Sequence, residues 1–157
     1  MYLVTPNGEL FRGGEVSNID RIYTGVAKIP PHSETNVSKA TYETPDWKII
    51  SATAGTKSAF TNVTSSTSAS ITASNRVYVY EYKGTPFEVS KLHPLLTAGN
   101  DSSYPDTFTT NFVKLENVNN KTRMTVSVTR NDLLSNASPG SNWAGSFNLN
   151  ILLIQID

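Results

Sequence analysis

The sequence predicts an all-β fold, an antiparallel β-sandwich or jelly roll of about eight to ten short strands. The first observation is that residues 77–82 and 124–129 alternate with a period of two, which is typical of strands. The second is that no long stretch carries an apolar stripe at helical spacing. The third is the abundance of Thr, which favours strands, and of Ser and Asn, which favour turns.

The length and composition predict a single β-sandwich domain over residues 1–157. A chain of 157 residues is long enough to bury a substantial core. Charged residues make up only 17% of it, below the roughly 25% typical of globular domains, and polar uncharged residues replace them. The expected product is a β scaffold with a lightly charged surface.

The first part of the chain reads as a hairpin followed by a strand. Residues 2–4 and 9–11 flank the turn sequence Pro-Asn-Gly at 6–8, which predicts a small hairpin. Residues 22–29 form the next expected strand, and the proline pair at 30–31 ends it.

In the middle of the chain, residues 33–45 are expected to be a loop or an edge strand, and residues 47–52 a strand. Residues 58–75 carry no charge, and a loop and a strand fit them equally well. Residues 76–82 give the clearest strand pattern, with Tyr and Val on opposite faces.

The remaining elements follow from alternation and turn residues. A strand is expected to begin at residues 87–89, and Pro94 and residues 99–105 are expected in loops. The other predicted strands are 108–115, 121–130 and 147–156, with a hairpin turn at 117–120 and a loop at 131–142. Because the last strand is apolar on both sides from residue 151, it is expected to be central or in a subunit contact.

The charge balance argues against several partners. With 13 basic and 13 acidic residues the net charge is zero, so no basic excess is available for nucleic acid. The apolar run at 151–154 is far shorter than the roughly 20 residues of a membrane span, and we expect no membrane insertion. The absence of cysteine excludes disulfides and thiolate metal sites.

No catalytic, cofactor or metal motif is recognisable in the sequence. His32 and His93 stand far apart without an acid-rich neighbourhood that would orient a catalytic imidazole. Residues 100–106 are rich in Asp and Ser but lack the spacing of a calcium loop, so a hydrogen-bonded loop is expected there. We therefore predict no enzymatic activity, no cofactor and no metal.

Aromatic residues in loop-like surroundings are the best indication of a ligand site. Trp143 and Tyr104 lie among Asn142, Asp101 and Asp106. A flat apolar ring beside polar groups is the chemistry that binds sugars. A core or interface anchor is the alternative interpretation of Trp143.

Three tyrosines, Tyr78, Tyr80 and Tyr82, share one face of a predicted strand. Rings stacked in this way usually pack across strands within a core. The second interpretation is that the three rings form a subunit interface.

The whole chain resembles the small virion proteins of tailed bacteriophages and prophages, especially tail or fibre-associated components. The opening at residues 2–10, Tyr-Leu-Val-Thr-Pro-Asn-Gly-Glu-Leu, the body rich in Ser, Thr and Asn, and the apolar final strand ending at Asp157 carry this resemblance. It implies a β-sandwich subunit, usually oligomeric, that builds a particle or touches the host surface. No functional residue is transferred from it.

The sequence therefore leads to a non-enzymatic structural or host-attachment component of a phage particle, located in the virion and otherwise soluble. Expected partners are further copies of the chain, with a trimer favoured, other virion proteins, and a host-surface glycan. A carbohydrate-binding module that uses Trp143 and Tyr104 is the second hypothesis. A glycan hydrolase or lyase with scattered catalytic residues is the third.

Overall fold

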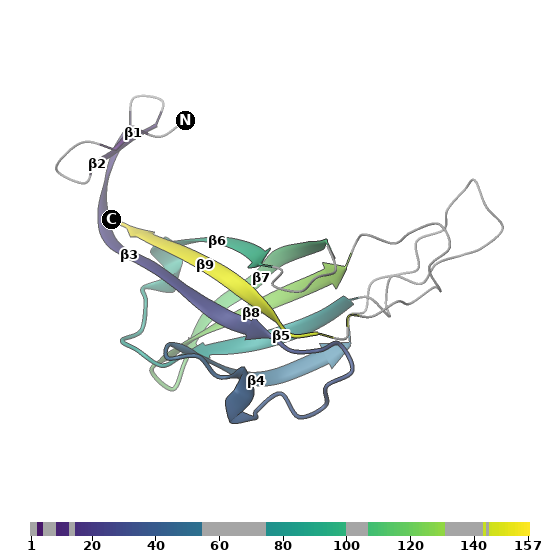
Figure 1. Ribbon diagram of the computed structural model, residues 1–157. Coiled ribbons are helices and arrows are strands. Elements are labelled where there is room, and N and C mark those ends of the chain that lie inside the picture. Colours follow the sequence, from purple (N-terminus) through teal and green to yellow (C-terminus); the bar gives the residue numbers. More distant parts are fainter. Residues whose placement is uncertain are drawn as a thin grey trace, which may run out of the picture.

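The computed structural model describes residues 3–4, 9–12, 15–54, 75–99, 107–130, 143 and 145–157. Within them, nine strands form two antiparallel sheets that pack as a sandwich, which confirms the predicted fold class (Figure 1). The strands are β1 (Leu3–Val4), β2 (Glu9–Arg12), β3 (Glu15–Ile29), β4 (Trp47–Ala54), β5 (Asn75–Tyr82), β6 (Leu92–Gly99), β7 (Phe108–Val118), β8 (Lys121–Arg130) and β9 (Phe147–Ile156).

The two sheets differ in composition and in extent. The first has the order β1-β2-β3-β9-β6 and the second the order β4-β5-β8-β7. Strand β9 lies between β3 and β6, so of the two predicted alternatives the central position is confirmed. We refer below to the side of each sheet that faces the other sheet as its inner face.

Several strand predictions are confirmed with their bounds. β8 and β9 begin and end where the alternation predicts, and β5 begins one residue earlier than predicted. The hairpin between β7 and β8 turns at Asn119 and Asn120, whose φ angles are 51° and 60°. Two consecutive positive φ angles are typical of the type I′ turn, for which Asn is a favoured residue.

The prediction of a strand at residues 87–89 is wrong. A short 3₁₀ helix spans Val89–Lys91, and the strand β6 begins only at Leu92. Pro94, expected in a loop, lies inside β6. The edge position of β6 explains this, because a proline in an edge strand can direct its missing N–H away from the ladder.

At the N-terminus, the predicted hairpin is confirmed as β1 and β2, which pair antiparallel. β3 begins at Glu15, earlier than expected, and its first four residues pair with β2. The hairpin and the start of β3 extend beyond the body of the two sheets (Figure 1). The region predicted as a loop or edge strand before β4 holds a short 3₁₀ helix at Ala40–Tyr42.

The core lies between the inner faces and is rich in aromatic rings. Side chains from both sheets interdigitate there, as in other sandwiches. The largest fully buried side chains are Trp47, Trp143, Tyr78, Tyr80, Phe87, Phe147, Ile29, Met124, Leu149, Leu153, Val126 and Val128.

Tyr23 of β3 joins the edges of the two sheets. Its hydroxyl donates to Asp46 Oδ2 at 2.8 Å and accepts from the indole N–H of Trp47 at 2.9 Å. Its ring also takes the space that a side chain at Gly25 would need, since a Cβ there would lie 1.9 Å from the tyrosine oxygen. Burial, followed by the bond to Asp46, raises the pKa of Tyr23 above its usual value.

Candidate functional site

Trp143 is in the core and is only 1% exposed. Its indole N–H donates to the carbonyl of Pro30 at 2.8 Å. Its ring packs edge to face against the rings of His32 and Phe108, with ring centroids 4.9 and 5.3 Å apart. The core-anchor interpretation therefore fits this residue. A sugar ring cannot stack on an indole whose faces are covered, so the expected ligand role of Trp143 does not fit its position.

Tyr78, Tyr80 and Tyr82 share the inner face of β5, as the alternation predicts, and all three are buried. The hydroxyl of Tyr80 donates to the carbonyl of Lys28 in β3 of the opposite sheet, and that of Tyr78 to the carbonyl of Pro30, which directly follows β3. The three rings thus hold the two sheets together. Their burial leaves no surface for the subunit interface that was the second interpretation.

The other ligand candidates, Tyr104, Asp101, Asp106 and Asn142, lie outside the described residues. In the chain, the strand ends Gly99 and Phe108 flank the first three, and the strand end Arg130 and Trp143 flank Asn142. The registers Phe108 with Arg130 and Gly99 with Asn148 place these strand ends at one end of the sandwich.

His32 lies beside Trp143 and does not form a catalytic pair among the described residues. Its Nε2 atom is buried without a hydrogen-bond partner, and the Arg76 guanidinium donates to its backbone carbonyl. Burial lowers the pKa of His32, so the ring is neutral at neutral pH. A neutral imidazole that packs against an indole fits a structural role for His32.

The outer face of the first sheet is the most unusual surface that the structure describes. Along β9, Leu149, Ile151 and Leu153 are buried, so the residues between them point outward. The outward residues of β3, β9 and β6 stand in cross-strand rows. These rows are Ile22–Ile154–His93, Thr24–Leu152–Leu95, Val26–Asn150–Thr97 and Lys28–Asn148–Gly99.

Apolar side chains fill the middle of this outer face. Leu95 is 60% exposed, Ile22 57% and Val26 39%, and the half-buried Leu152 and Ile154 lie between them. Single exposed apolar residues are normal, whereas contiguous groups of them are typical of interaction surfaces. We call Ile22, Val26, Leu95, Leu152 and Ile154 the apolar face.

The apolar face includes an open hollow of about 560 Å³. Three cross-strand rows line it, from β3, β9 and β6. Its side chains are methyl-rich and carry no ionisable group, so it offers contact area without a reactive centre. The lining residues are Thr24, Gly25, Val26, Leu95, Leu96, Thr97, Asn150, Ile151 and Leu152.

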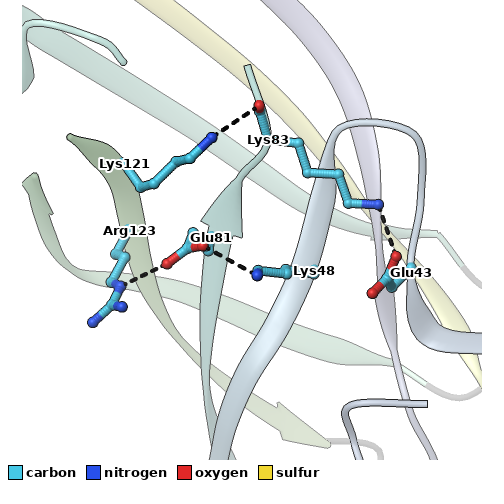
Figure 2. Close-up of polar contacts among 6 residues, drawn as sticks. All are labelled: Glu43, Lys48, Glu81, Lys83, Lys121 and Arg123. Atoms are coloured by element: carbon cyan, nitrogen blue, oxygen red, sulfur yellow. Dashed lines mark hydrogen bonds and ion pairs between the residues drawn. The ribbon is translucent and has the colours of Figure 1, made fainter. Parts of the chain in front are cut away.

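The outer face of the second sheet has the opposite character. Figure 2 shows Glu81 between Lys48 and Arg123, one residue from each of three neighbouring strands. The Glu81 carboxylate lies 2.9 Å from Arg123 Nε and 3.4 Å from Lys48 Nζ. The next two rows mix the half-buried Val77 and Val79 with polar residues such as Thr53 and Ser127, so water can solvate most of this face. The exposed apolar side chains of the second sheet lie on its two edge strands, and they are Ile50, Phe112 and Val113.

The charged row of the second sheet leads to a prediction about acid stability. The side chain of Glu81 is only 11% exposed. Burial acts to raise its pKa, but the bonds to Arg123 and Lys48 outweigh it, and the pKa of Glu81 is lowered. A lowered pKa means that this stabilisation is complete above about pH 4.5 and is lost as the pH falls below that value.

We therefore expect Glu81→Gln to lower the free energy of unfolding by about 1.5–3 kcal/mol at pH 7, because two charge-assisted contacts are lost. The difference in unfolding free energy between the variant and the wild type should become smaller as the pH falls below about 4.5. Urea unfolding of both proteins between pH 3 and 7 measures this difference. Glu116→Gln, at a more exposed ion pair with Lys114, is the control and should cost less than about 1 kcal/mol.

Among the described residues no group of His, Asp and Glu is arranged to hold a metal ion, and no helix is long and apolar enough to cross a membrane. Comparisons with known proteins add no family: no family model, no curated protein and no solved structure matches the chain.

Sequence reasoning missed most of the apolar face. The two-sided apolar pattern of β9 was the one available signal, because it includes Leu152 and Ile154. Whether Ile22 and Leu95 stand beside them depends on the order of the strands, which alternation does not reveal.

Proposed function

We propose that the protein is a non-enzymatic structural or host-attachment component of a bacteriophage particle that acts by self-association through the apolar face. The observation that carries the proposal is the contrast between the two sheets. One outer face carries the charged row of Glu81 with mostly polar residues beside it, and the other exposes Ile22, Val26 and Leu95 together with Leu152 and Ile154.

The two outer faces differ in what they gain when a neighbour displaces the water that covers them. Burying apolar surface is favourable by roughly 25 cal/mol per Å², whereas burying charges without partners is costly. An assembly of identical subunits therefore gains most by covering the apolar face and leaving the charged row in water. Stable homo-oligomers bury apolar patches of this kind.

The assignment to a virion rests on the resemblance of the whole sequence to small virion proteins. The low content of charge and the all-β fold suit a subunit that is covered by neighbours in a particle. The hairpin of β1 and β2 reaches beyond the sandwich body and offers backbone to a neighbour (Figure 1). The trimer favoured by the sequence and the contacts with other virion proteins stay predictions.

Two measurements test this proposal. Peptide mass spectrometry of purified particles from the phage or prophage that encodes the chain should find it in stoichiometric amounts. In solution, the purified protein should form a defined oligomer rather than a monomer of 17.1 kDa. A protein that is absent from particles and monomeric in solution would refute the proposal.

A further inference from the structure

Strand β3 has one long edge that no strand of the described chain covers. From Arg21 to Ile29 it pairs with β9 in an unbroken register. On its other side, β2 pairs only with the first part of the strand, Glu15–Asn18. The described chain therefore leaves β3 unpaired along this side beyond residue 18.

The backbone groups that point to this edge can be assigned. The carbonyl of Lys28 accepts a hydrogen bond from the Tyr80 hydroxyl of the second sheet, whereas the carbonyl of the next residue, Ile29, accepts from Ser146, which precedes β9. Since successive residues of a strand direct their backbone groups to opposite sides, Ile22, Thr24 and Val26 point theirs to the open edge. No bond to another element satisfies these groups among the described residues.

The other three edges of the sandwich body carry features that oppose strand pairing. β6 contains Pro94, which lacks a backbone donor. β4 has a register shift between Ile49 and Ser51, and β7 has one between Phe112 and Lys114. Prolines and bulges are the usual protection of sheet edges. Between Arg21 and Ile29, β3 has neither feature, so its edge is the one suited to pairing.

We propose that a second copy of the chain pairs with this edge, β3 against β3, antiparallel about a two-fold axis at Thr24. In this register Thr24 faces the partner's Thr24, and Ile22 faces the partner's Val26. The Ile22–Val26 contact repeats on the other side of the axis. Asp20 stands at the register shift between Ile19 and Arg21 and lies outside this pairing. One register thus matches the apolar side chains and the free backbone groups.

The pairing rests on the proposed function, because it is one way in which the chain associates with itself. Facing antiparallel pairs of apolar residues stabilise a sheet. The pairing also joins the first sheets of two subunits edge to edge, which brings their apolar faces together as a continuous surface. A two-fold contact gives an even subunit number, in contrast to the trimer favoured by the sequence.

A pair of introduced charges tests the register. Ile22→Lys and Val26→Asp should each weaken dimerisation about tenfold, because a charged side chain then faces an apolar one at two places. The double variant I22K/V26D should recover much of the association, because each lysine then faces an aspartate of the partner. Unchanged dimerisation in both single variants, or no recovery in the double variant, would overturn the β3 pairing.

A cysteine at the axis gives an independent readout, since the chain has no cysteine of its own. Facing residues lie about 4.5–5.5 Å apart at Cα, within the range that a disulfide spans. Thr24→Cys should therefore form a covalent dimer under mild oxidation. The control Thr53→Cys, exposed on β4 of the second sheet, should stay uncrosslinked.

The outcomes separate the two proposals. An oligomer that persists while Thr24→Cys fails to crosslink overturns the β3 pairing and leaves self-association through the apolar face standing. A monomer at every concentration overturns both. Crosslinked dimers of a protein that particles do not contain support the pairing and refute the role in a virion.

Discussion

Trp143→Ala is expected to lower the free energy of unfolding by about 3–5 kcal/mol, the usual cost of removing a large buried ring. The indole is 1% exposed and contacts His32 and Phe108. Its N–H donor is lost as well, which leaves the carbonyl of Pro30 without this partner. A loss of this size is a large fraction of the stability of a typical domain.

Urea unfolding followed by circular dichroism measures this effect. Leu95→Ala is the matched control, because Leu95 is 60% exposed and its truncation should change the stability of the monomer by less than about 0.5 kcal/mol. If Trp143→Ala unfolded within about 1 kcal/mol of wild type, the placement of this indole in the core would be contradicted, and a surface role would again deserve a test.

Leu95→Lys is expected to weaken self-association at least about thirtyfold, which corresponds to about 2 kcal/mol at a central contact residue. Leu95 stands beside Leu152 in the row of Thr24 and is the most exposed residue of the apolar face. An ammonium group there loses its water when the face is covered and finds no acidic partner in its row. The monomer should fold normally, since the side chain is exposed.

Sedimentation velocity at several protein concentrations measures the weakening. Thr53→Lys places the same charge on the exposed surface of the second sheet and should associate as the wild type does. Equal association of all three proteins would show that the apolar face is not buried between subunits.

Much of the fold follows from local sequence, because a strand with one buried face shows itself by alternation. β8 and β9 are cases where alternation and a turn agree, and their bounds were predicted correctly. β6 was missed because proline usually interrupts a strand, although an edge strand tolerates Pro94. Whether a proline faces the ladder or the solvent depends on strand order, which is a property of the whole fold.

The site was harder to predict than the fold. Trp143 stands among turn residues, and nothing in its neighbours shows that the ring returns to the core to meet Pro30, more than a hundred positions away. The apolar face likewise brings together Ile22, Leu95 and Leu152 from three distant segments. Such groupings depend on tertiary pairing, which single-sequence patterns do not contain.

Self-association through the first sheet is the central claim, and sedimentation equilibrium of the wild-type protein tests it most directly. The β3 pairing predicts a mass that rises with concentration from 17.1 kDa toward twice that value or a higher even multiple. An odd multiple would retain the apolar face as an interface and reject the two-fold pairing. A mass of 17.1 kDa at every concentration would contradict self-association itself.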